Sequence, residues 1–168
     1  ITLLGEHAGY YRHALSRIGA VIETPAAFDN LTVRQNLKVV AIQHGLSDEK
    51  LISKTISLVG LDEKAKTKAK KLSLGLRQRL GLAIAVLAQP DFVILDEPTN
   101  GLDPMGILQF RTLVKRLQSE FNTTILISSH ILTELYQVAT KFAFLHRGHI
   151  LRVLTKAELS AKTRGGLE

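Results

Sequence analysis

The clearest structural signal in this chain is the stretch F-V-I-L-D-E-P-T at residues 92–99. Four apolar residues run directly into two acids, Asp96 and Glu97. A run this apolar predicts a strand that is covered on both faces, as the strands of a parallel sheet are. Unpaired carboxylates are costly to bury, so both acids are expected where the strand leaves the core. The carboxyl edge of such a sheet is the usual place for a ligand. The alternative is a strand end with two solvated acids.

The sequence around this strand alternates apolar runs with capped helical segments. Strands are predicted over 1–4, 21–22, 92–95, 123–127, 142–145 and 149–153, and helices over 32–45, 47–60, 74–88, 104–120 and 131–139. The run at 123–127 is apolar and β-branched, so it predicts a second buried strand. Alternation after residue 89 predicts an α/β fold with a mostly parallel sheet and crossover helices.

The first half of the chain holds consecutive helices with no strand between them, which predicts a helical insertion into that sheet. At 168 residues the length suits one domain. We therefore expect a single domain in which about 26–88 form a helical subdomain, while 1–25 and 89–168 form the sheet core.

Two further places carry groups that could bind an anion. Ser73 and Gly75 stand at a predicted helix N-terminus, where free N–H groups and the helix dipole attract phosphate. The alternative for Ser73 is an ordinary helix cap. His130 follows the strand predicted at 123–127, on the same sheet edge, and could donate to a phosphate. The alternative for His130 is an exposed loop residue.

Composition narrows the possible partners. There are 22 Lys and Arg against 15 Asp and Glu, a net charge of +7, which can favour nucleic acid, anionic lipid or polyphosphate. Part of this charge comes from the cluster of Lys64, Lys66, Lys68, Lys70 and Lys71. The alternative for this cluster is a solvated linker. The chain has no cysteine, which excludes disulfides and thiolate metal sites. No apolar run approaches the roughly 20 residues that a membrane helix needs.

Taken in order, these segments resemble the ATP-binding cassette (ABC) ATPase, a P-loop NTPase. Residues 72–78 are similar to its LSGGQ signature, with Leu74 for the first Gly and Leu76 for the Gln. Residues 94–97 resemble Walker B, residues 100–103 resemble the D-loop, and His130 resembles the switch histidine.

The resemblance implies ATP and Mg²⁺ as cofactors and assigns each residue a role. Asp96 would organise Mg²⁺, Glu97 would be the catalytic base, and His130 would contact the γ-phosphate. Asp103 would cross a dimer interface and link two ATP sites. Nucleotide held by the opposite subunit would be contacted by the signature residues Ser73, Leu74, Gly75 and Gln78.

Two partners are implied as well: a second ABC ATPase subunit and an integral membrane permease. The chain would then lie in the cytoplasm, peripherally on the inner face of the cell membrane. The alternatives are a non-hydrolysing regulatory module and a nucleic-acid-linked cassette. The presence of Glu97 argues against the first. The lack of a long coiled-coil insertion argues against the second, as does a length that fits only one cassette.

Two departures from the family pattern are expected to matter. The family has a Gln where the strand enters the helical subdomain, but this chain has Glu23. Glu23 could approach Mg²⁺ or the attacking water as an anion, or act mainly in coupling to the permease. Glu23 and Leu76 both resemble the subgroup linked to bacitracin and lantibiotic export or immunity.

The second departure concerns the phosphate loop. No G-x-x-x-x-G-K-[ST] motif occurs in the 168 residues. We therefore expect an N-terminally truncated cassette, whose Walker A loop would precede Ile1, and we expect this chain alone to be inactive.

Overall fold

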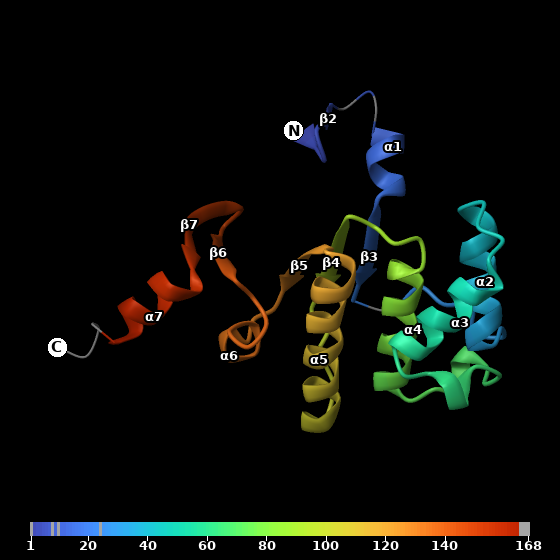
Figure 1. Ribbon diagram of the computed structural model, residues 1–168. Coiled ribbons are helices and arrows are strands. Elements are labelled where there is room, and N and C mark those ends of the chain that lie inside the picture. Colours follow the sequence, from blue (N-terminus) through green and yellow to red (C-terminus); the bar gives the residue numbers. More distant parts are fainter. Residues whose placement is uncertain (1, 8, 10, 24, 165–168) are drawn as a thin grey trace. The chain divides into compact units, whose positions relative to one another are not determined.

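A computed structural model describes residues 2–7, 9, 11–23 and 25–164, and Figure 1 shows its ribbon. The chain forms two compact units, Ile1–Ser129 and His130–Glu168. The first unit contains, in order, β1 (Thr2–Leu3), β2 (Glu6–His7), α1 (Tyr11–Ser16), β3 (Ile18–Ile22), α2 (Val33–Gln43), α3 (Glu49–Leu58), the short 3-10 helices η2 (Asp62–Lys64) and η3 (Ala69–Lys71), α4 (Leu74–Val86), β4 (Phe92–Asp96), α5 (Pro104–Phe121) and β5 (Thr124–Ser128). The second unit contains α6 (Leu132–Leu135), β6 (Lys141–His146), β7 (His149–Thr155) and α7 (Lys156–Arg164).

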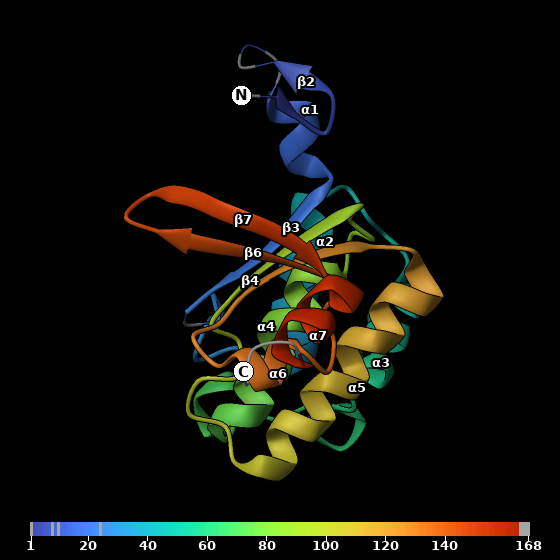
Figure 2. The same ribbon diagram turned by 90° about the vertical axis from the view of Figure 1, so that its left-hand side faces the viewer.

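The three longer strands of the first unit form a parallel sheet in the order β3-β4-β5. Figure 2 shows β3 and β4 running side by side. On β4, Val93 and Leu95 are almost completely buried, whereas Phe92 and Ile94, on the opposite face, are half-buried, so the predicted cover of both faces is found in full on one face only. The α/β fold with a parallel sheet and crossover helices is therefore confirmed.

Helix α4 packs against β3 and the segment after it more closely than side chains on both sides would allow. A Cβ placed on Gly19 would lie 2.0 Å from the carbonyl oxygen of Ala85. Likewise, a Cβ on Gly81 would lie 2.5 Å from Cβ of Pro25. Glycine at these two positions is what permits the close approach, and it fixes α4 relative to the sheet.

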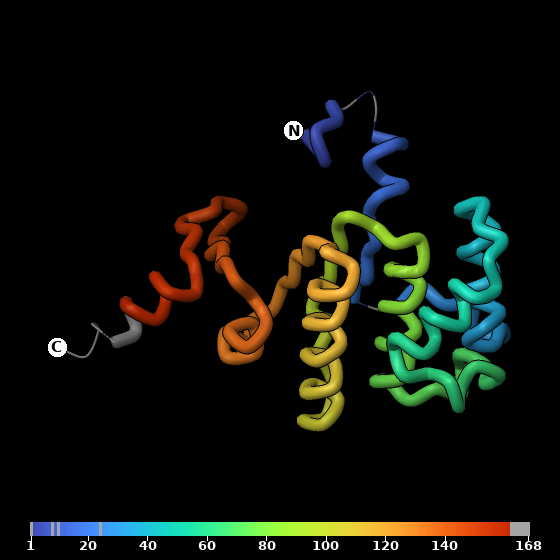
Figure 3. Tube along the Cα trace, in the orientation of Figure 1, coloured from blue at the N-terminus to red at the C-terminus, as the bar shows by residue number. Residues whose placement is uncertain are grey.

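Helices α2, α3 and α4 pack on one another and form the predicted helical segment (Figure 3). Thr32 caps α2 through a capping box with Gln35, and Asp48 caps α3. The segment that leads from β3 into α2 is held by Asn36, whose side chain is 1% exposed. Its Oδ1 accepts from the N–H of Phe28 at 2.7 Å, and its Nδ2 donates to the carbonyl of Thr32 at 3.0 Å. The same Nδ2 also reaches the carbonyls of Phe28 and Leu31.

Replacing Asn36 with Leu is expected to lower the free energy of unfolding by about 1 to 3 kcal/mol, because the N–H of Phe28 would lose its acceptor and the carbonyls of Phe28, Leu31 and Thr32 would each lose one of their donors. Urea denaturation of the 168-residue chain measures this. Gln43→Leu, an amide-to-Leu change at an exposed position of the same helix, is the control. Equal losses in the two variants would contradict the role given to Asn36.

Three expectations about the elements need correction. The N-terminal region also forms helix α1, which the sequence did not predict. β5 is not buried as predicted, since Leu126 is 53% exposed. This strand pairs with β4 on one side and, among the described residues, with no strand on the other. The helix predicted over 131–139 is confined to α6, because the N–H groups of Gln137 and Val138 bond three residues back, to Glu134 and Leu135, and so interrupt the helical pattern.

In the second unit, β6 and β7 form the predicted antiparallel hairpin. Its two turn residues, Arg147 and Gly148, have φ of 47° and 79°. Positive φ at both central positions is the geometry that two-residue hairpin turns favour, because it matches the strand twist. Of the helices in the part of the chain that the structure describes, none is both long and apolar enough to cross a membrane.

Candidate functional site

The carboxyl ends of the three parallel strands bring three residues into one row. The register pairs Ile22 with Asp96, and Asp96 with Ser128. Because the strands are parallel and in step, Asp96 lies in the middle of the row, at the sheet edge where the sequence predicted it. Glu23 and Glu97 each come one residue after this row.

The hydroxyl of Ser128 links the two acids at the end of β4. Its Oγ donates to Oδ1 of Asp96 and accepts from the backbone N–H of Glu97 at 3.0 Å. Ser128 therefore fixes one carboxylate oxygen of Asp96 and the backbone position of Glu97. Ser128 was not among the site residues predicted from the sequence. The usable signal was that β5, like β4, ends its apolar run on a polar residue, and parallel strands bring such residues together.

Glu97 begins a tight turn that leads to α5. Its φ is 45°, in the left-handed region that few non-glycine residues adopt. Its carbonyl accepts from the N–H of Asn100 at 3.1 Å. The turn continues to Asp103, which caps α5 through a 2.9 Å bond from the N–H of Gly106 to its Oδ1. Within its own subunit, Asp103 is thus a helix cap.

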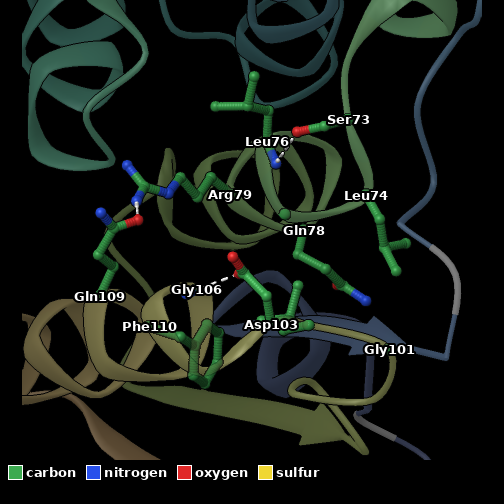
Figure 4. A pocket seen from close by; sticks show the side chains of 12 residues that line it. Ser73, Leu74, Leu76, Gln78, Arg79, Gly101, Asp103, Gly106, Gln109 and Phe110 are labelled. Carbon is green, nitrogen blue, oxygen red and sulfur yellow. Dashed lines mark hydrogen bonds between the residues drawn. The ribbon is translucent and has the colours of Figure 1, made fainter.

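The signature-like segment lies beside this turn. Ser73 caps α4, with its Oγ accepting from the N–H of Leu76 at 3.4 Å. A pocket of about 350 Å³ separates the start of α4 from the start of α5 and is lined by residues 73–76, 78–79, 101–103, 106 and 109–110 (Figure 4). The structure therefore brings the predicted signature and D-loop segments together.

Gln78 and Arg79 belong to the signature side of this pocket. Gln78 is only 4% exposed, and Figure 4 shows its amide reaching toward the turn at Gly101. Arg79 donates to the side chain of Gln109 on α5 and, at 3.3 Å, to the carbonyl of Val59. Arg79 was not among the predicted site residues, yet its guanidinium connects α4 to both α5 and the end of α3.

Glu23 and His130 lie outside the contacts described so far. Glu23 is exposed at the end of β3, with φ of 47°. His130 is the first residue of the second unit, and its predicted contact with the γ-phosphate stays a prediction. The role of Glu23 at Mg²⁺ also stays a prediction.

The resemblance implies a bound Mg²⁺ ion, for which carboxylate oxygens are suitable ligands. Among the described residues, no three His, Cys, Asp or Glu side chains form a cluster that could hold a metal. Mg²⁺ at phosphate sites does not need one, because it is usually bound by one or two carboxylates together with phosphate oxygens and water. A single oriented carboxylate, Asp96, fits that pattern.

The sequence matches a known protein family and several named relatives. Residues 1–100 match the family model described as ABC transporter. The chain is 42% identical to the bacitracin transport ATP-binding protein BcrA of Bacillus licheniformis, over 94% of this chain and 51% of that protein. It is 41% identical to the lantibiotic transport ATP-binding protein SrtF of Streptococcus pyogenes, over 89% of this chain and 65% of that protein.

A solved structure shares the fold. CbiO1 of Clostridium perfringens, described as part of the ABC transporter complex cbiONQ, superposes with a TM-score of 0.85 at 24% identity. The match covers 95% of this chain and 65% of that one. The chain spans about half the length of the two bacitracin transport proteins that it matches. Since the family model covers more than half of the sequence, the chain belongs to the ABC transporter ATP-binding family.

Proposed function

We propose that this chain is the part of an ABC transporter ATPase that orients Mg²⁺ and the attacking water and presents a signature to a second subunit. The observation that carries this is the arrangement at the sheet edge, where Ser128 bonds to the side chain of Asp96 and the backbone of Glu97. A metal-organising carboxylate beside a second acid on a fixed backbone suits hydrolysis of a phosphoanhydride.

Each residue has a distinct task in this proposal. Asp96 would hold Mg²⁺, directly or through a water ligand of the ion. ATP would supply the phosphoryl group, and the bound Mg²⁺ would neutralise part of the phosphate charge. Glu97 would orient the attacking water and accept its proton. His130 would donate to a γ-phosphate oxygen, and Glu23 would approach the ion or the water, or couple the site to the permease.

The second subunit would be met through the α4 side. The start of α4 offers backbone N–H groups and the positive end of a helix dipole. Ser73, Leu74, Gly75 and Gln78 would meet nucleotide held by the opposite subunit, and Asp103 would lie at the interface between the two.

A membrane permease would be the partner that uses this ATPase, so the chain would act peripherally at the cytoplasmic side of the membrane. The transport functions for which BcrA and SrtF are named support export of, or immunity to, peptide antibiotics. Glu23 and Leu76, which resemble that subgroup, support the same choice.

The test compares two polypeptides. One is the 168-residue chain, and the other, called the joined protein below, carries the same residues after a segment with G-x-x-x-x-G-K-[ST]. We expect Mg²⁺-dependent ATP hydrolysis by the joined protein and none by the 168-residue chain, because backbone N–H groups and a Lys must cradle the phosphates.

Two results would overturn this proposal. One is turnover by the 168-residue chain that Glu97→Gln abolishes, because the phosphate cradle would then be unnecessary. The other is a joined protein that folds and binds ATP but does not hydrolyse it.

A further inference from the structure

We propose that Leu74 is a positioning residue that couples the signature segment to Glu97 within one subunit, through contact with Gly101. This inference rests on the proposed function, because it describes how the start of α4 acts on the hydrolytic residue. Figure 4 shows the Leu74 side chain directed toward the turn at Gly101.

Leu74 occupies the space that a side chain at position 101 would need. A Cβ on Gly101 would lie 2.8 Å from Cδ2 of Leu74, nearer than real Cβ contacts come. Leu74 therefore lies directly over the backbone of Gly101, although half of Leu74 (49%) is exposed. A glycine at position 74, as in the family pattern, would have no side chain to make this contact.

Leu102 lies near the open position beside Gly75, so the same two segments also approach each other there. A Cβ on Gly75 would lie 3.5 Å from Cδ2 of Leu102, an ordinary van der Waals distance. Two consecutive residues at the start of α4 thus face two consecutive residues of the turn. A displacement of the start of α4 would be transmitted to the turn by packing.

The turn carries this displacement to Glu97 over four residues. The N–H of Asn100 bonds to the carbonyl of Glu97, and the N–H of Leu102 bonds to the carbonyl of Thr99, both at 3.1 Å. Glu97 is held at its other end by the bond from its N–H to Ser128. We infer that nucleotide engaging the start of α4 adjusts Glu97 of the same subunit along this route.

Two substitutions would release the contact from opposite sides. Leu74→Ala removes the side chain that presses on the turn. Gly101→Ala adds a methyl group that displaces Leu74, and Leu74 can move because the atom in the way is the end of a half-exposed side chain. If the contact is the coupling element, either change alone removes it, and the second change then removes nothing more.

The experiment is a double-mutant cycle on kcat for ATP hydrolysis by the joined protein. Leu74→Ala and Gly101→Ala are each expected to lower kcat roughly tenfold, within the range for residues on a coupling route. The double variant is expected to show about the same loss, because contacting residues are not additive.

A matched control separates backbone strain from loss of the contact. Gly101 has φ of 74°, so alanine there is strained whatever its neighbours are. Gly45 has φ of 67°, and no atom lies within 4 Å of a Cβ placed on it, so Gly45→Ala carries the strain without the contact. We expect Gly45→Ala to keep the parent kcat and to lower Tm about as much as Gly101→Ala does.

Outcomes for this inference differ from those for the proposed function. If the double variant loses roughly 100-fold in kcat, as two independent sites would, the coupling role of Leu74 is overturned. Single variants that keep the parent kcat would overturn it too. If the Gly101→Ala protein does not fold, the test is the comparison of kcat between Leu74→Ala and Leu74→Met. The Met variant is expected to keep most of the parent kcat, and the Ala variant is expected to lose it. If the parent joined protein binds ATP without turnover, the proposed function fails first.

Discussion

Replacing Glu97 with Gln in the joined protein is expected to lower kcat for ATP hydrolysis by about 10²- to 10⁴-fold, the usual contribution of a general base. The amide has nearly the same shape as the carboxylate but cannot accept the proton of the attacking water. The bonds of this residue to Ser128 and from Asn100 use its backbone and survive the change. Binding of ATP is therefore expected to persist.

Steady-state phosphate release and equilibrium ATP binding, measured on the same samples, check this expectation. Glu63→Gln makes the same chemical change at an exposed residue of η2 and should leave kcat unaltered. A Glu97→Gln protein with the parent turnover would show that Glu97 is not the base.

Replacing Gly19 with Ala is expected to reduce the free energy of unfolding by about 3 kcal/mol or more, at the upper end of overpacking effects. The new Cβ would meet three backbone atoms of Ala85 between 2.0 and 3.2 Å away. No side chain can rotate to relieve this contact, so α4 must separate from β3.

Urea unfolding of the 168-residue chain measures this loss. Gly9→Ala is the control, since no atom lies within 4 Å of a Cβ at Gly9. If the two variants lost equal stability, the close approach of α4 to β3 would not be a constraint on the fold.

Much of the fold could be predicted from local chemistry. Thr32, Asp48 and Ser73 cap helices in the structure because their side-chain oxygens satisfy N–H groups of the first turn. The apolar run of β4 predicted a buried strand, and two of its residues are almost completely buried. Helix caps depend on neighbours in sequence, which the order of residues shows directly.

Features that depend on distant parts of the chain were harder to predict. An apolar run shows that β5 can be covered, but other elements decide whether it is, and Leu126 is more than half exposed. The bond of Ser128 to Asp96 requires the strand register, which no local pattern fixes. The contact of Leu74 with Gly101 requires the packing of α4 beside the turn before α5.

The most direct single measurement is the size of the Glu97→Gln joined protein in solution, with and without Mg²⁺-ATP. If the start of α4 binds nucleotide held by a second copy, slowed hydrolysis should trap a dimer with Mg²⁺-ATP that returns to monomer without it. A protein that binds Mg²⁺-ATP and stays monomeric at saturation would contradict the proposal that the signature segment of one subunit completes the ATP site of another.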